Sequence, residues 1–117
     1  MSQTILLVED DADLREAMSA LLEAEGFEVA AAPNGMAGLK LLERIGRPCL
    51  ILLDWWLPLL SGSEFLSCLR ADPQRHSVPV VVLTASEAPP PTEAEGFLRK
   101  PFESARLLNL VHSCCTP

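Results

Sequence analysis

The 117-residue sequence predicts a single α/β domain in which helices cover both faces of a doubly wound parallel sheet. Two observations carry this prediction. Five short apolar segments recur along the chain, and in all intervals but one they are separated by segments with helical apolar spacing. The hydrophobic content of 49% is also high enough to fill one buried core and too high for a disordered chain.

Three of the predicted strands, at residues 4–9, 49–54 and 78–84, are continuous runs of Leu, Ile and Val. Because continuous rather than alternating apolarity implies burial on both faces, these runs are typical of central parallel strands. Two weaker candidates, residues 27–32 and 96–100, bring the expected number of strands to five.

The first helix is predicted from an apolar stripe at helical spacing over residues 14–22, and Gly26 is placed to end it. Asp11 is the preferred N-cap of this helix, with a capping pair shifted to Asp13 and Glu16 as the alternative.

Three further helices are predicted from caps and apolar spacing. Asn34 is a suitable N-cap for a second helix that runs to Gly46. Ser61 and Glu64 have the spacing of a capping box and predict the start of a third. A terminal helix is expected around the stripe at residues 107–115, so the predicted order is βαβαβαβ, an interruption, then βα.

The interruption lies where a fourth crossover helix is due, between the last two strands. Residues 89–91 are three consecutive prolines, which lack backbone N–H groups and hold the residue before them in extended geometry. We therefore expect no helix longer than one turn in residues 86–95, with a proline-rich loop in its place. Residues 84–95 still supply the dozen or so residues that a parallel crossover needs.

Composition limits the possible partners and location. The net charge of −7 and the absence of a Lys/Arg cluster argue against nucleic acid, whose binding depends on releasing counterions from phosphates. No apolar run approaches a membrane span, and no basic signal-peptide flank precedes the first strand, so a cytoplasmic protein is expected. We expect residues 1–117 to form one domain without an output domain.

The four cysteines do not have the spacing of a metal-thiolate site, because there is no C-x-x-C motif and no nearby histidine. Cys49 and Cys68 are interpreted as small apolar core residues of a protein in a reducing compartment.

The residues that end the predicted strands indicate the chemistry. The first strand ends in Glu9, followed directly by Asp10, while Asp54 ends the third, Thr84 the fourth and Lys100 the fifth. In doubly wound sheets these ends converge on the ligand site. Each residue alone has an ordinary alternative role as a helix cap, a strand-end hydroxyl or a solvated charge. Together the carboxylates predict an oxygen-ligated Mg²⁺ (or Mn²⁺) site, and the ammonium and hydroxyl extend it to a phosphoryl site.

In order along the chain, four segments resemble the bacterial response-regulator receiver domain, the CheY-like family: "ILLVEDDADLR", "LILLDWWLP", "VVLTAS" and "FLRKPF". The 44 residues from Asp10 to Asp54 and the 30 from Asp54 to Thr84 are similar to the family's spacing. The resemblance implies a five-stranded sheet of order 2-1-3-4-5. Two features depart from the pattern. The 16 residues from Thr84 to Lys100 are fewer than usual by about six, or more than one helical turn, and Trp56 is bulky for its position.

The resemblance also implies roles for individual residues. Asp54 is similar to the family's phosphoacceptor, and Glu9 and Asp10 to the acidic pair that holds Mg²⁺ together with Asp54 and the backbone carbonyl of Trp56. Asp11 is then a neighbouring acid rather than a ligand.

On the other side of the phosphoacceptor, Thr84 is implied as the hydroxyl that moves toward the phosphoryl group, with Lys100 as its cationic neighbour. Phe97 is similar to the family's aromatic rotamer switch, and the Lys100–Pro101 peptide is expected to be cis. Trp56 and Ala85 border the expected phosphoryl entrance, where Trp56 is either an ordinary exposed aromatic or a shield of the acyl phosphate from water.

These features predict a phosphoacceptor that receives its phosphoryl group from a sensor histidine kinase or phosphotransfer protein and signals by binding a downstream protein. The alternative is a pseudo-receiver that binds a partner constitutively without phosphorylation. An aspartyl-phosphate hydrolase is disfavoured, since such an enzyme would want a carboxylate two residues after Asp54, where Trp56 stands. We therefore expect no enzyme acting on a separate substrate.

Overall fold

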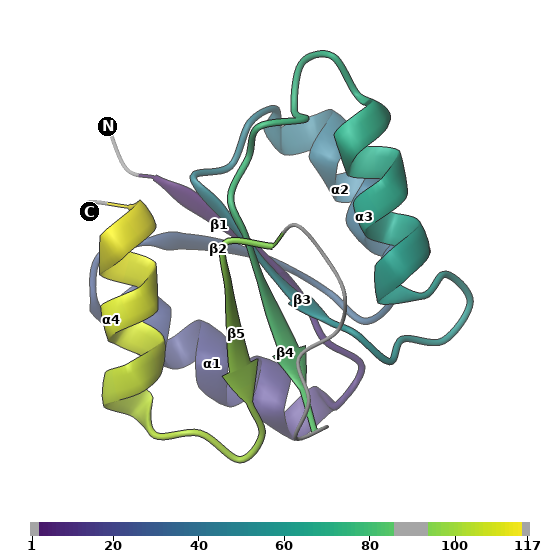
Figure 1. Cartoon of the computed structure of the whole chain (residues 1–117). Coiled ribbons are helices and arrows are strands. Elements are labelled where there is room, and N and C mark those ends of the chain that lie inside the picture. Colours follow the sequence, from purple (N-terminus) through teal and green to yellow (C-terminus); the bar gives the residue numbers. More distant parts are fainter. Residues whose placement is uncertain (1–2, 86–93, 116–117) are drawn as a thin grey trace.

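The computed structural model describes residues 3–85 and 94–115 and has the expected α/β architecture (Figure 1). Its elements are β1 (Thr4–Val8), α1 (Ala12–Ala24), β2 (Glu28–Ala32), α2 (Gly35–Ile45), β3 (Leu50–Asp54), α3 (Gly62–Ala71), β4 (Val80–Thr84), β5 (Gly96–Arg99) and α4 (Ser104–Cys114). The five strands form one parallel sheet of order β2-β1-β3-β4-β5, which confirms the predicted fold class and strand order.

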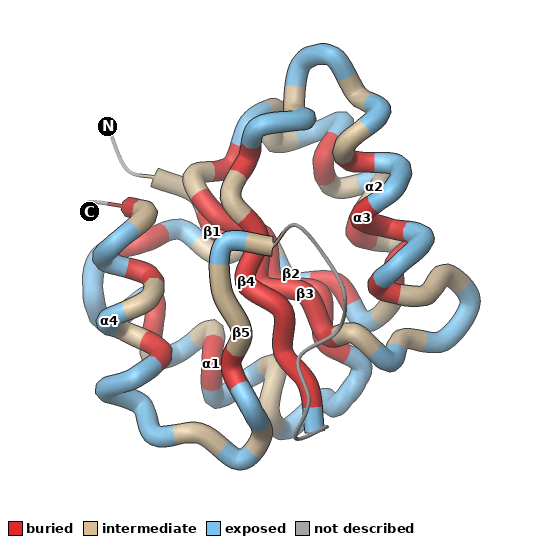
Figure 2. Tube along the Cα trace, viewed as in Figure 1, coloured by how far each residue is buried: buried red, intermediate tan, exposed pale blue. Residues whose placement is uncertain are grey.

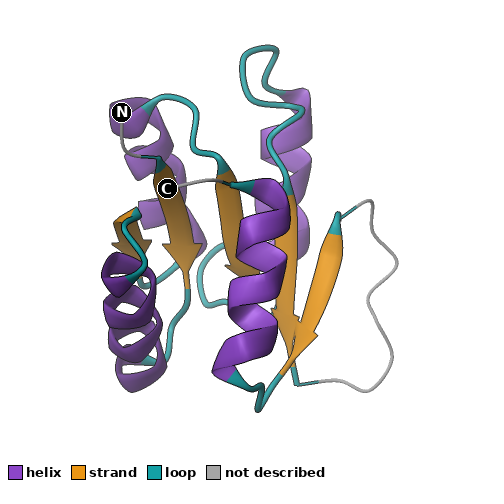
Figure 3. Cartoon of the chain, turned by 90° about the vertical axis from the view of Figure 1, so that its left-hand side faces the viewer, coloured by secondary structure: helices purple, strands orange, loops and turns teal. Residues whose placement is uncertain are grey.

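Two helical layers enclose the sheet. Helices α1 and α4 cover one face, and α2 and α3 cover the other (Figures 1 and 3). Side chains alternate between the two layers along each central strand: in β1, Ile5 and Leu7 face α1 and α4, whereas Leu6 and Val8 face α2 and α3. The central strands are buried throughout in Figure 2, which explains why their sequences are continuously apolar.

The helices begin where local sequence places caps. The Asp11 side chain accepts hydrogen bonds from the backbone N–H groups of Asp13 and Leu14, which confirms Asp11 as the N-cap of α1 in preference to the shifted pair. Asn34 caps α2, and Ser61 and Glu64 form the reciprocal capping box of α3.

The cysteine interpretation is wrong on both residues. Cys68 lies on the solvent-facing side of α3 and is exposed, because Leu66 and Leu69 on either side of it turn toward the sheet. Cys49, just before β3, is disulfide-bonded to Cys115 after α4. A pairing across 66 residues depends on where α4 ends above the sheet, which cysteine spacing cannot reveal.

The prediction for the proline-rich crossover falls mainly on residues 86–93, which lie outside the described residues, so it stays a prediction. Within the described parts of the chain, no helix is long and apolar enough to cross a membrane.

Candidate functional site

Four strand ends bring the predicted site residues to one edge of the sheet. Strand β1 leads into Glu9, Asp54 is the last residue of β3, Thr84 is the last residue of β4, and Lys100 follows β5. The register aligns these ends, since Val8 pairs with Leu53 and Thr84 with Arg99. Parallel strands deliver their carboxyl ends to the same side, so the convergence follows from topology.

Three carboxylates form the centre of the site. Glu9, Asp10 and Asp54 each offer an oxygen, and these oxygens lie within 4.8 Å of one another. Glu9 is fully buried and Asp54 is only 5% exposed, whereas Asp10 is open to solvent. Three acids gathered in this way repel one another unless protons or cations intervene.

Lys100 supplies one positive charge to this cluster. Its Nζ lies 2.5 Å from Glu9 Oε1 and 3.4 Å from Asp54 Oδ2. Glu9 Oε1 is fully buried and accepts no hydrogen bond of good geometry from the described residues. Its contact with the Lys100 ammonium is therefore an ion pair and not a well-aligned hydrogen bond. A buried carboxylate oxygen in this condition remains under-satisfied and suits an additional cation.

The pKa values show how the cluster shares its charge. Burial raises the pKa of Asp54 to about 7, and proton-sharing hydrogen bonds and charge repulsion from the neighbouring acids act in the same direction. Partial burial acts to raise the pKa of Asp10, yet hydrogen bonds to Asp54 and Glu9 outweigh it and leave that pKa lowered. Near neutral pH the three carboxylates therefore do not all carry a charge unless a cation binds among them.

Lys100 remains charged throughout this range. Burial acts to lower the pKa of its ammonium, but the close contact with Glu9 and the charge of Asp54 outweigh burial and raise that pKa. The Lys100 backbone N–H also donates to the Thr84 carbonyl at 2.8 Å, and the Lys100–Pro101 peptide is cis, as predicted. The Lys100 backbone is thus fixed to the end of β4, and its ammonium is held by the acids.

The acidic loop is held by a residue that the sequence analysis missed. Arg15 Nη1 donates to the backbone carbonyl of Glu9 at 2.8 Å, and the Asp11 backbone N–H donates to Glu9 Oε2 at 3.2 Å. Arg15 lies four residues after the N-cap Asp11, one turn into α1, and this spacing could have indicated that it reaches back to the loop.

The loop after β3 fixes the other side of Asp54. The Trp56 backbone N–H donates to Asp54 Oδ1 at 3.1 Å. Gly62 opens α3 directly against this loop, where an added Cβ would lie 2.9 Å from the Asp54 carbonyl oxygen and 2.8 Å from Trp55 Cα. Leu59, in the same loop, has a positive φ of 69° and an 80% exposed side chain. The loop is therefore tightly constrained near Asp54.

The remaining predicted residues lie around this centre. Thr84 is buried, and Ala85 beside it is exposed. The Trp56 side chain is 70% exposed. Phe97 is half-buried in β5 and packs against the core layer under α2 and α3, so the structure places it behind the site rather than in the cluster of charges.

The donor set is suited to a hard divalent cation. All available groups are oxygens: three carboxylates whose oxygens lie close together, one of them under-satisfied. Mg²⁺ and Mn²⁺ prefer such ligands, and no cysteine or histidine lies in the cluster to favour zinc. The residues fit the cation that the sequence predicts.

Comparison with known proteins gives a consistent result. The family model described as the response regulator receiver domain matches residues 5–112. The DNA-binding response regulator MtrA of Mycobacterium tuberculosis is 35% identical over 97% of this chain, which spans about half of that protein's length.

Solved structures agree in fold over nearly the whole chain. The chemotaxis protein CheY4 of Vibrio cholerae superposes with a TM-score of 0.90 at 26% identity, covering 98% of this chain and all of that one. The receiver domain of sensor histidine kinase PA1611 from Pseudomonas aeruginosa, described with a magnesium ion in its active-site cleft, gives a TM-score of 0.89 at 29% identity over 97% of this chain and 98% of that one.

Proposed function

Because the chain belongs to the response regulator receiver domain family, we propose that it is a phosphoacceptor of a two-component phosphorelay, with Asp54 as the residue that is phosphorylated. The observation that carries the proposal is the convergence of Glu9, Asp10 and Asp54 within 4.8 Å, with the Lys100 ammonium 3.4 Å from Asp54. This arrangement places a nucleophilic carboxylate beside an acidic pair and within 3.4 Å of a positive charge.

In the proposed reaction a carboxylate oxygen of Asp54 attacks the phosphorus of a phosphohistidine on a sensor kinase or phosphotransfer protein. The new O–P bond makes an acyl phosphate, the P–N bond breaks, and the histidine imidazole leaves with the bonding electron pair. Lys100 stays protonated and neutralises negative charge on the transferred group, and the hydroxyl of Thr84, the last residue of β4, is proposed to donate a hydrogen bond to that group.

The proposal includes Mg²⁺, held by the carboxylates of Glu9, Asp10 and Asp54 together with the backbone carbonyl of Trp56. When bound, this cation supplies charge neutralisation for the phosphoryl oxygens. Glu9 contributes an enclosed oxygen whose only close cation in the described structure is Lys100, which supports a ligand role directly or through water.

We propose a phosphoacceptor rather than an enzyme with a separate substrate, since the residue two positions after Asp54 is Trp56 and not an acid that could protonate a leaving group. The partners proposed are a histidine-containing phosphodonor and a downstream protein. DNA binding is stated in the name of MtrA and belongs to that protein. For these 117 residues the net charge of −7 supports protein rather than nucleic-acid partners.

A cytoplasmic location is part of the same proposal. Its support is that Cys68 is an exposed free thiol, which is typical of proteins kept in a reducing compartment, whereas the Cys49–Cys115 disulfide is of a kind that persists in oxidising compartments and argues against it. Cell fractionation would test it, and recovery of the protein outside the cytoplasmic fraction would contradict it.

The test of function is incubation with a small phosphodonor and Mg²⁺, followed by intact mass measurement. Wild type should gain one phosphoryl group, Asp54→Ala should gain none, and Asp72→Ala should behave as wild type because Asp72 caps the far end of α3. Phosphorylation that persists in Asp54→Ala would exclude this phosphoacceptor.

A pseudo-receiver gives a different result in a titration with Mg²⁺ and a phosphate mimic, followed through the fluorescence of Trp55 and Trp56. A phosphoacceptor should respond in wild type and not in Asp54→Asn. An absent response in wild type, or the same response in both proteins, would favour the constitutive binding module.

Trp56 has a more specific proposed role as a partial shield of the acyl phosphate. Its backbone is fixed to Asp54 by a hydrogen bond, but its side chain is 70% exposed, so we expect only modest shielding. Dephosphorylation of Trp56→Asn should be faster than that of wild type, and an unchanged rate would sink the idea.

A further inference from the structure

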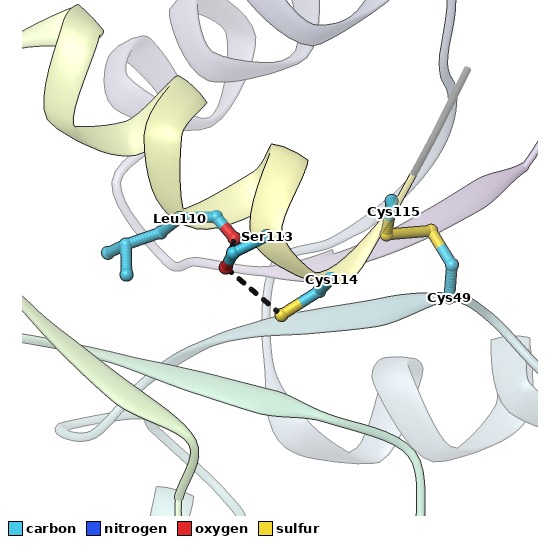
Figure 4. The surroundings of a disulfide bond; sticks show 5 residues. All are labelled: Cys49, Leu110, Ser113, Cys114 and Cys115. Atoms are coloured by element: carbon cyan, nitrogen blue, oxygen red, sulfur yellow. Dashed lines mark hydrogen bonds between the residues drawn. A yellow bond between two sulfur atoms is a disulfide. The ribbon is translucent and has the colours of Figure 1, made fainter.

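The end of α4 is joined to the beginning of β3 at the side of the sheet opposite the carboxylate cluster. Cys49 immediately precedes β3, and Cys115 immediately follows α4 (Figure 4). Their Cα atoms lie 5.7 Å apart, within the range for a disulfide between backbones that need not move. The bond therefore joins two segments that the fold already brings together.

The pairing selects one of two adjacent cysteines. Cys114 is a free thiol whose Sγ lies 3.8 Å from Ser113 Oγ, and Figure 4 shows it directed away from the Cys49–Cys115 bond. Cys68 is a free thiol on the exposed side of α3. Cys115, the residue directly after α4, is therefore placed to pair with Cys49, and the adjacent Cys114 is not.

Burial determines where an exchanging thiol or disulfide can attack. Cys115 is only 3% exposed and belongs to the core layer under α1 and α4, whereas Cys49 is half-buried at the entrance to β3. Cys49 is therefore the more exposed residue of the pair, and we expect exchange to begin there, whereas Cys115 is protected until the end of α4 moves.

We propose that Cys49 and Cys115 form a reversible dithiol–disulfide couple, exchanging with a low-molecular-weight disulfide of the glutathione class, that controls how firmly the end of α4 is held to the sheet. The Cys49 thiolate attacks the small disulfide, forming a mixed disulfide and releasing one thiolate. The Cys115 thiolate then displaces the second. The protein pair loses two electrons and two protons, and the small disulfide becomes two thiols.

The effect should be confined to α4 because the two joined elements are held differently. Strand β3 pairs with β1 on one side and β4 on the other, so it stays in place without the disulfide. Helix α4 lies over the edge strand β5 and is anchored by Leu107 and Val111. In its last turn the polar support is an exposed contact of 3.2 Å between His112 and Glu25. Opening the bond therefore releases the last turn of α4 first.

Alkylation with mass mapping tests the couple in the whole chain. After treatment with oxidised glutathione, Cys49 and Cys115 should be recovered as one disulfide-linked pair of peptides, while Cys68 and Cys114 should each be either alkylated or joined to a single glutathione. In a dithiol reductant all four cysteines should be alkylated once the protein is denatured. The melting temperature should fall by about 5 °C or more on reduction, because the bond closes a loop of 66 residues in the unfolded chain.

Two variants form a matched pair in adjacent positions. Cys115→Ser should lose the redox-dependent shift in melting temperature, and Cys114→Ser should keep it. If Cys115→Ser does not fold, the comparison of oxidised and reduced wild type still decides. Free Cys49 in oxidised glutathione, no shift in wild type, or loss of the shift in Cys114→Ser would each overturn the couple.

Discussion

Replacing Asp54 by Asn should stabilise the metal-free protein, although Asp54 is the proposed phosphoacceptor. The folded protein raises the pKa of Asp54 from its usual value of 3.8 to about 7, because the side chain is buried beside Glu9 and Asp10. A carboxyl whose folded pKa lies above its unfolded pKa stabilises the fold fully only below the unfolded value. That contribution is lost as the pH rises through the folded value.

The size of the effect follows from the shift. About 3 pKa units at roughly 1.4 kcal/mol each set a ceiling of about 4 kcal/mol for the stability lost by pH 8. The lowered pKa of Asp10 has the opposite effect on stability, because the two carboxyls share a proton and Asp10 stabilises the fold when it is ionised. This offsets part of the ceiling, so we expect Asp54→Asn to be more stable than wild type by about 2 kcal/mol. The Asn carbonyl can still accept the hydrogen bond from the Trp56 backbone N–H.

Urea unfolding of wild type and Asp54→Asn in a chelator, at about pH 5 and about pH 8, measures this gain. The advantage of the variant should grow between the two pH values, and added Mg²⁺ should stabilise wild type more than the variant. An advantage that does not depend on pH, or a variant less stable at pH 8, would refute the electrostatic reasoning.

The loop between β3 and α3 supports three further predictions, each checked by urea unfolding. Gly62→Ala should lose about 2 kcal/mol, because the new Cβ would press on the Asp54 carbonyl oxygen, and an unchanged stability would show that the loop yields. Ser61→Ala should lose about 1 kcal/mol with the capping box, whereas exposed Ser63→Ala should change little, and equal losses would contradict the capping role. Leu59→Gly should gain about 0.5 kcal/mol by relieving its positive φ, while Leu59→Ala should not, and a gain in both would point to a different cause.

The parts of the structure that the sequence predicted correctly depend on short-range rules or on topology. Asp11, Asn34 and Ser61 cap the helices expected of them because a cap needs only its own next few residues. The site residues meet because parallel strands with helical crossovers must deliver their ends to one edge, and Asp54 and Thr84 are the last residues of their strands.

The parts that the sequence did not predict depend on side-chain direction or on exact position in space. Cys68 is apolar enough for a core, but its place on α3 turns it outward. The Cys49–Cys115 bond requires the last turn of α4 to end above the start of β3, which no local pattern determines. The contact of Arg15 with the Glu9 carbonyl likewise depends on how α1 leaves the acidic loop.

The electrostatics of the site links stability to the proposed function. Asp54 must be ionised to attack a phosphorus atom, yet the metal-free fold keeps a proton on it up to about pH 7. The repulsion that raises this pKa is the same repulsion that a divalent cation would relieve, so cation binding and ionisation of Asp54 must favour each other. By the same linkage a bound cation would stabilise the folded chain, and above its dissociation constant this stabilisation would grow with the logarithm of its concentration. Lys100 alone does not remove the repulsion, because its ammonium is closest to Glu9, and Asp54 therefore depends on the cation more than its neighbour does.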